Sequence, residues 1–204
     1  MRVLPAMLLL VPALAWAEPV TYHWTGTVVS VTDGTNGTYD LRGTFSNGQA
    51  ATFDLTVERS TPGTPVGSYY MSYSGAVNSL AATIGTYSFT GTFPISSIDI
   101  SNDNPDVGHT YDDFYCNVNP LSGNPIGTVN LSDAAFTFSD QEGTSWSSKA
   151  LPRPFPAMSG FEYKFVDVSW GNLSTQGSVR VSFDAVTTPA FGSSWGALKN
   201  LYRQ

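Results

Sequence analysis

The sequence predicts an all-β fold, an antiparallel β-sandwich or jelly roll, from three observations. Apolar and polar residues alternate with a period of two in several short runs, which is typical of strands with one buried and one solvated face. Turn-forming pairs such as Asn-Gly separate these runs. No stretch before residue 190 has the 3.6-residue period of an amphipathic helix. We therefore expect about ten to twelve short strands and a short C-terminal helix.

The first two strands are expected over residues 22–31 and 51–58. In the first, the aromatic residues Tyr22 and Trp24 share one face, and the second alternates apolar and polar residues throughout. Asn47-Gly48, just before the second, is a pair typical of a tight hairpin turn. We therefore expect a hairpin that joins a strand ending at Phe45 to the strand starting at residue 51.

The later strands follow the same pattern. Gly85-Thr86 separates two apolar runs and marks another turn. Alternating aromatic residues line residues 129–139 and 161–168, and residues 178–186 alternate most cleanly of all. The chain has no fixed-period repeat, so residues 18–188 are expected to form one sandwich domain.

The C-terminal residues 189–204 have a different character. Ser193 or Ser194 could cap a short helix, and Trp195, Leu198, Leu201 and Tyr202 would then fall on one side of it. Ser194 also completes a G-x-S-x-G match, but a hydrolase elbow of this kind needs an Asp and a His later in the chain. The eight residues that follow Gly196 contain neither. We therefore do not expect Ser194 to be catalytic.

The N-terminus has the features of a secretory signal peptide over residues 1–17. Arg2 is followed by an apolar run that closes on Ala15-Trp16-Ala17, a small-x-small cleavage pattern. The run is shorter than the roughly 20 residues that span a bilayer, and Pro5 and Pro12 interrupt it. We expect a secreted, periplasmic or cell-surface protein with no transmembrane segment in the mature chain.

Charge and cysteine content narrow the classes of partner. The formal net charge is -7, and the few Lys and Arg residues are scattered singly. A nucleic-acid partner is therefore not expected, because binding to phosphates needs a basic patch. Cys116 is the single cysteine, so no internal disulfide can form. It is expected to be a buried, unreactive thiol, and a nucleophile or an intermolecular bridge is the alternative.

Several short segments follow one another along the chain in an order that is also found in a known group of exported proteins. They are Trp24-Thr-Gly-Thr-Val28, Gly43-Thr-Phe45, Ile84–Gly91, Ile100–Asn104, Asp133–Phe138, Ser148–Pro152 and Gly177–Val181. In style and order, residues 20–188 resemble the β-sandwich proteins among bacterial PEP-CTERM cargo. That resemblance implies association with exopolysaccharide and the cell envelope. The chain lacks the Pro-Glu-Pro motif, apolar helix and basic cluster of the sorting tail, so the sorting route is not carried over.

An acidic segment in the middle of the chain is a candidate metal site. It contains Asp99, Asn102, Asp103, Asn104 and Asp106. Ca²⁺ takes six to eight oxygen ligands from carboxylates, amide carbonyls and backbone, which these residue types supply. The spacing is not that of an EF-hand. The alternative is a solvated turn in which Asn and Asp bond to nearby backbone groups.

The same region is the candidate for catalysis. His109 lies close in sequence to Asp112 and to the acidic segment, and a His–carboxylate pair can act as a general base. The predicted catalytic residues are therefore His109 and Asp112. In this hypothesis the protein is a secreted hydrolase of esters or lactones, and it uses a divalent cation or the His–carboxylate set around Asp103 and Asp106.

Aromatic residues are the candidates for ligand contact. Trp146, Trp170, Trp195 and the Tyr69–Tyr73 segment could stack on sugar rings, or they could instead form the core. The leading hypothesis from the sequence is an exported cell-envelope or extracellular binding protein, calcium-stabilised, with a polysaccharide or a small molecule as its ligand. The hydrolase is the alternative.

Overall fold

The computed structural model describes residues 19–34, 40–92, 96–106, 109–171 and 176–188. These residues form an antiparallel sheet of thirteen strands, so the all-β, sandwich-like prediction is confirmed. The predicted signal peptide and the predicted C-terminal helix lie outside the described residues. Within the described ranges, no helix is long and apolar enough to cross a lipid bilayer. The strands are β1 (Pro19–Thr32), β2 (Ala50–Glu58), β3 (Thr64–Val66), β4 (Tyr70–Ser74), β5 (Val77–Ile84), β6 (Tyr87–Thr92), β7 (Ser97–Ser101), β8 (Asn104–Asp106), β9 (His109–Val118), β10 (Ser122–Gly123), β11 (Leu131–Asp140), β12 (Tyr163–Trp170) and β13 (Gly177–Thr187), with a 3₁₀ turn η2 (Met158–Gly160) before β12.

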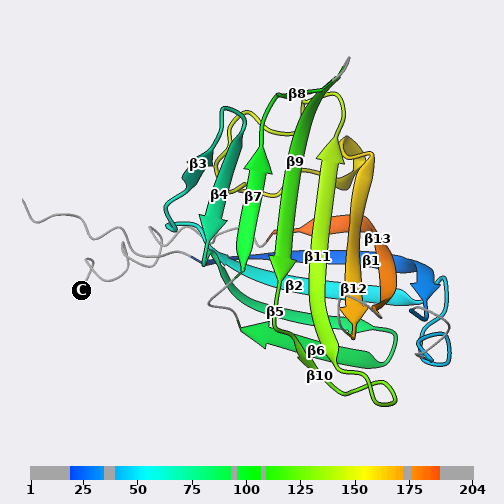
Figure 1. The fold of residues 1–204 in the computed structure, drawn as a ribbon. Helices are drawn as coiled ribbons and strands as arrows, with labels where there is room; N and C mark the ends of the chain where they lie inside the picture. The colour runs from blue at the N-terminus through cyan, green and yellow to red at the C-terminus, as the bar shows by residue number, and fades with distance from the viewer. Residues whose placement is uncertain (1–18, 35–39, 93–95, 107–108, 172–175, 189–204) are drawn as a thin grey trace, which may run out of the picture.

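One continuous sheet curls over to make two layers (Figure 1). The front layer runs β12-β11-β9-β7-β4-β3, and β8 pairs with the end of β9. The back layer runs β13-β1-β2-β5-β6-β10, and its strands cross steeply behind those of the front layer. The two apolar faces therefore face each other, as in orthogonally packed sheets.

The corner between the layers lies where β13 passes from β12 to β1. β13 pairs with β12 only from Gly177 to Ser182, and it continues along β1 as far as Thr187. Its pairing with β1 contains two bulges, which leave Asp184 in β13 and Val29 in β1 without an opposite residue. Bulges bend a strand and increase its twist, so they let the sheet turn here without a break in the ladder.

The core between the layers is rich in aromatic residues. Trp24 at its centre is fully buried and lies 5.3–5.8 Å, between ring centroids, from five other rings. Four of these neighbours come from strands of both layers, and the fifth comes from a loop. They are Tyr22, Phe136, Phe138, Phe155 and Phe183. The predicted inward faces of residues 22–28, 51–58 and 178–183 are confirmed.

The loop over residues 141–162 closes one end of the core. It contains η2 and no strand, yet Trp146, Leu151, Phe155 and Phe161 in it are buried. The loop therefore contributes packing as a strand would. Period-two alternation does not predict this contribution, because the apolar residues of the loop do not alternate.

The two turn predictions have different outcomes. Gly85-Thr86 forms the predicted turn, since Ile84 pairs with Tyr87 across β5 and β6. The hairpin predicted at Asn47-Gly48 is wrong, because no strand ends at Phe45. Instead, the Phe45 amide donates to the Leu41 carbonyl at 2.7 Å, and the Phe45 ring packs 5.2 Å from Trp170. Phe45 is therefore buried in the core, but it belongs to a turn and not to a strand.

Candidate functional site

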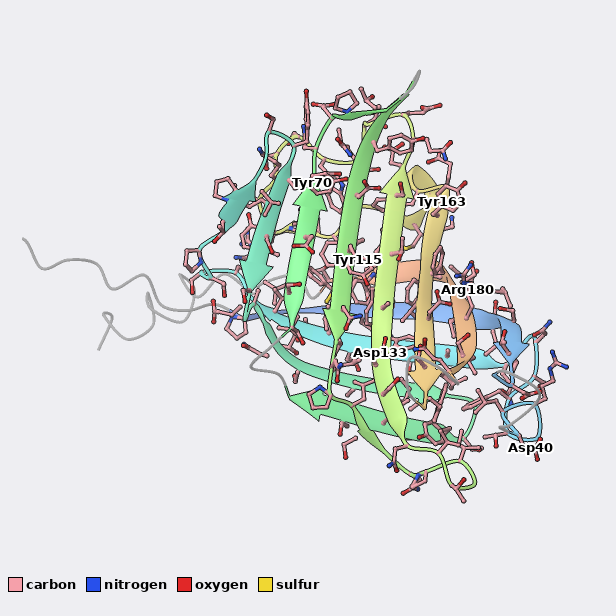
Figure 2. The ribbon with its side chains drawn as sticks, in the orientation of Figure 1. Asp40, Tyr70, Tyr115, Asp133, Tyr163 and Arg180 are labelled. Carbon is pink, nitrogen blue, oxygen red and sulfur yellow. The ribbon has the colours of Figure 1, made fainter. Side chains whose placement is uncertain are left out.

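The outer face of the front layer presents three exposed tyrosines. Tyr70 on β4, Tyr115 on β9 and Tyr163 on β12 are 36%, 40% and 49% exposed, although neighbouring residues of the same strands are buried. Figure 2 shows the three of them spread over this layer. We call the surface that they share the tyrosine face.

Strand register explains why the three side chains share one face. Tyr70 pairs with Ser101, and Tyr163 pairs with Ser139, which is opposite Asp113. Tyr115 is two residues beyond Asp113 in β9 and therefore points to the same side. Each neighbouring pair of tyrosines is separated by two strand intervals, or about 10 Å across the sheet.

Polar groups fill the space between the tyrosines. Asp113 accepts hydrogen bonds from the hydroxyls of Ser139 at 2.5 Å and Ser101 at 3.1 Å, so its carboxylate is held in place. Asp99 and Thr137 are opposite Tyr115 on its two sides. Each exposed ring therefore has hydroxyl or carboxylate groups beside it.

Tyr70 is fixed by its neighbours at one end of the tyrosine face. Its hydroxyl accepts a hydrogen bond from Nδ2 of Asn104 at 2.7 Å. Partial burial, and then the nearby charge of Asp113, raise the pKa of Tyr70 above its ordinary value. The phenol is therefore neutral at physiological pH and can itself donate a hydrogen bond.

A cation lies at the opposite end of the same face. Arg180 donates two hydrogen bonds to Asp167, at 2.8 and 2.7 Å, and its guanidinium lies 4.0 Å from the centre of the Phe165 ring. Hydrogen bonding to Asp167 raises the pKa of Arg180, while burial opposes this shift. The pair is neutral overall, and Asp99, Asp113 and Asp133 are further carboxylates among the described residues of the front layer.

The predicted calcium ligands lie on β7 and in the segment that leads through β8. Their described side chains do not converge on one point. Asp99 is on β7 and faces outward beside Tyr115, while Asn102 and Asp103 form the turn into β8. Nδ2 of Asn102 donates to Asp103 at 2.6 Å, and Asn104 donates to Tyr70. Among the described residues, no group of three or more His, Cys, Asp or Glu could hold a metal ion. The calcium site stays a prediction, and equal melting temperatures in EDTA and in millimolar Ca²⁺ would contradict it.

The predicted catalytic pair is placed only in part. The backbones of Asp106 and His109 pair across β8 and β9, but the side chains of both lie outside the described part of the chain. Asp112 is fully buried, and its carboxylate accepts the amides of Asp103 at 2.9 Å and Trp146 at 2.7 Å. Asp112 therefore has a structural role, because its carboxylate links the turn before β8 to the 141–162 loop. Its catalytic role with His109 stays a prediction.

Electrostatics agree with this structural contact of Asp112. Burial raises the pKa of its carboxyl, with smaller contributions from the charges of Asp103 and Asp140, while the two amide hydrogen bonds act in the opposite direction. Asp140, also buried, accepts the amides of Glu142 and Thr144 at 2.8 Å. The two carboxylates hold successive parts of the same loop.

The other candidates from the sequence have mixed outcomes. Trp146 and Trp170 are buried core residues and do not belong to the tyrosine face, whereas Tyr70 is exposed as a sugar contact requires. Trp195 lies outside the described residues. Tyr115 and Tyr163 are further exposed rings that were not predicted from the sequence, because the alternation within β9 and β12 does not by itself show which face is outward. Cys116 is fully buried, as predicted, and burial raises its pKa far above the ordinary value. It is therefore an unreactive thiol.

Comparison with known proteins adds no assignment to this geometry. No family model, no curated protein and no solved structure matches the chain.

Proposed function

We propose that the protein is an exported cell-envelope or extracellular binding protein, and that the tyrosine face binds a neutral polysaccharide. The observation that carries this proposal is the set of exposed Tyr70, Tyr115 and Tyr163 rings, interleaved with fixed hydroxyl and carboxylate groups on one sheet face.

The chemistry of sugars favours this ligand class. A pyranose ring presents C–H groups on its faces and hydroxyls around its rim. An aromatic ring can cover the C–H face, while adjacent carboxylates and hydroxyls bond the rim. Tyr115, flanked by Asp99 and Thr137, supplies both kinds of contact. The side chains are held by strands, so little conformational entropy is lost on binding.

Spacing and charge favour a long, uncharged chain over other partners. Neighbouring tyrosines are about 10 Å apart across the sheet, which is further than a single sugar ring reaches. A polymer would therefore contact several of them at once. A protein partner would be expected to use a contiguous apolar patch, and here polar groups separate the rings. Asp99 and Asp113 lie between them and would repel a polyanion.

Export is part of the same proposal and has its own support. The signal-peptide pattern of residues 1–17 and the resemblance to exported envelope proteins both favour a location where polysaccharide is present. Expression from Met1 in a Gram-negative host should give a product that starts near Glu18. Recovery of the intact Met1 end would contradict export.

Binding is tested with the mature chain by affinity electrophoresis in gels that contain hydroxyethylcellulose, xyloglucan, galactomannan or dextran, with alginate as the acidic control. At least one neutral polymer should retard the protein. Tyr115→Ala should weaken the retarding interaction roughly two- to tenfold, the range of one aromatic contact. Tyr115→Phe keeps the ring and should bind nearly as the wild type does.

Val29→Ala is the matched control, because Val29 is exposed on β1 in the other layer. It should leave retardation unchanged. A triple Ala variant of Tyr70, Tyr115 and Tyr163 that still binds like the wild type would overturn the proposal. The absence of retardation in every neutral polymer would do the same.

A further inference from the structure

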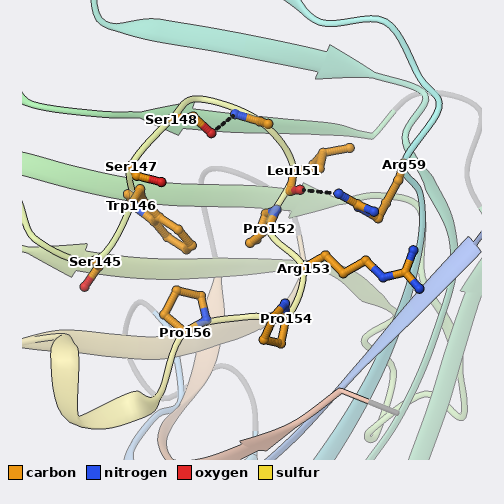
Figure 3. A pocket seen from close by; sticks show the side chains of 11 residues that line it. Arg59, Ser145, Trp146, Ser147, Ser148, Leu151, Pro152, Arg153, Pro154 and Pro156 are labelled. Atoms are coloured by element: carbon orange, nitrogen blue, oxygen red, sulfur yellow. Dashed lines mark hydrogen bonds between the residues drawn. The ribbon is translucent and has the colours of Figure 1, made fainter. Parts of the chain in front are cut away.

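A second candidate site lies away from the tyrosine face, where the 141–162 loop passes the end of β2. A pocket of about 290 Å³, open to solvent, lies between the loop and Arg59, as Figure 3 shows. Arg153, the hydroxyl residues Ser147 and Ser148, and the apolar residues Trp146 and Leu151 also line it. We call it the arginine pocket.

The charge of this pocket is opposite to that of the molecule. The chain carries nine Lys and Arg against sixteen Asp and Glu, yet the described residues that line the pocket include two arginines and no Asp or Glu. Lys149 is in the same loop but is not among the described residues that line the pocket, and its Nζ donates to the Ser68 carbonyl at 2.8 Å. A local positive potential on an acidic protein attracts anions.

Arg59 has unused hydrogen-bonding capacity. A guanidinium has five N–H donors, and in Arg59 one of them reaches the Leu151 carbonyl at 3.4 Å. Its Nε is buried and has no hydrogen-bond partner within the described ranges, and no described carboxylate forms an ion pair with the side chain. A half-buried cation in this state is stabilised if an anion binds beside it.

Hydrogen bonds hold the pocket wall in one shape. The buried hydroxyl of Tyr22 donates to the Pro152 carbonyl at 2.6 Å, and the Tyr73 hydroxyl donates to the Lys149 carbonyl at 2.7 Å. Asp112 fixes the Trp146 amide at the start of this wall. Three strands thus anchor the backbone of the loop, so the pocket wall needs little rearrangement when a ligand binds.

We propose that the arginine pocket binds a small oxyanion, a carboxylate such as that of a uronic acid or a phosphoryl group, between Arg59 and Arg153. The planar guanidinium fork matches the geometry of both groups. The volume is near the lower end of the range for ligand pockets, so the pocket suits a single monosaccharide-sized anion rather than a polymer. This inference does not depend on the tyrosine face.

The test is an NMR titration of the ¹⁵N-labelled mature chain with sodium glucuronate and, separately, with sodium phosphate, at constant ionic strength. At least one of these anions should shift the Arg59 Nε–H signal in a saturable way, and neutral glucose should not. Tighter binding of glucuronate would identify a sugar acid, and tighter binding of phosphate would identify a phosphoryl group. Either result supports the oxyanion site.

Arg59→Gln should weaken binding at least tenfold, and Arg153→Gln, at an exposed position, should also weaken it. Arg42→Gln is the matched control, because Arg42 pairs with Asp33 in the loop that follows β1. The proposal is overturned if neither anion shifts the Arg59 signal, if glucose shifts it equally, or if binding survives both pocket substitutions.

Discussion

Buried carboxylates in this protein organise loops. Asp112 belongs to the acidic segment that the sequence offers as the candidate for catalysis, and Asp140 lies further along the chain, at the end of β11. In the fold, their oxygens accept backbone amides from the β8 turn and from the 141–162 loop. A cluster of acidic residues in a sequence does not reveal whether the carboxylates face solvent, a ligand or the backbone.

Asp140 should make stability depend on pH. Burial raises the pKa of its carboxyl, but the hydrogen bonds from Thr144, Glu142 and Ser145 together lower it below the ordinary value. The folded state thus binds a proton less well than the unfolded state does. This contribution to stability is present above the unfolded pKa of about 3.9 and is lost as the pH falls through the folded pKa.

Asp140→Asn should therefore lower the free energy of unfolding by about 1–3 kcal/mol at pH 7, since Asn keeps only one of the two oxygens that accept the Glu142 and Thr144 amides and loses the charge. The difference from the wild type should shrink as the pH falls below about 4. Urea denaturation between pH 2.5 and 7 measures both effects. Asp184→Asn, an exposed position, is the control. A difference that stays constant with pH would contradict the ionic role of Asp140.

The corner between the layers depends on close contact of β1 and β13. Gly26 lies at the bulge, opposite Phe183, and a Cβ at this position would collide with the backbone carbonyl oxygen of Ser182. A backbone atom cannot move aside as a flexible side chain can. Glycine is therefore required here by the approach of the two strands.

Gly26→Ala should lower the free energy of unfolding by about 1–3 kcal/mol, the usual range for overpacking. Thermal melting followed by circular dichroism measures the change. Ser30→Ala in the same strand is exposed and should change little. An unchanged melting temperature for the Gly26 variant would mean that the strands can separate at the corner without loss.

In β12, alternation of residue types predicts the strand but does not predict which of its two faces is buried. Alternating apolar residues over 161–168 predicted a strand, and β12 is present. Phe165 and Tyr163 nevertheless point outward, and Val166 and Val168 form the core. Both alternating sets of this strand contain apolar residues, so the local pattern could not decide which set faces inward.

The whole domain should be independent of residues 190–204. The last strand ends at Thr187, and Thr188 accepts the Phe155 amide through its hydroxyl at 3.3 Å. Deletion of residues 190–204 should therefore keep the β-sheet signature in circular dichroism and change the melting temperature by only a few degrees. A truncated chain that fails to fold would show that Trp195, Leu198 and Leu201 are needed for the core.

The sequence by itself determined the class of the fold and the inward faces of several strands. Period-two alternation is a local property of a strand with one buried face, and it reads directly from segments such as residues 51–58. Composition and net charge likewise do not depend on which residues meet in the fold. The scattered Lys and Arg residues could therefore be used, from the sequence alone, as an argument against a nucleic-acid partner.

Only the tertiary structure decided which residues meet. Tyr70, Tyr115 and Tyr163 come from three strands far apart in the chain, and the order β12-β11-β9-β7-β4 brings them onto one face. Arg59 and Arg153 line one pocket for a similar reason, because a loop without a strand pattern folds back over the end of β2. Long-range pairing is selected by packing of the entire core, so no local pattern in the sequence encodes these contacts.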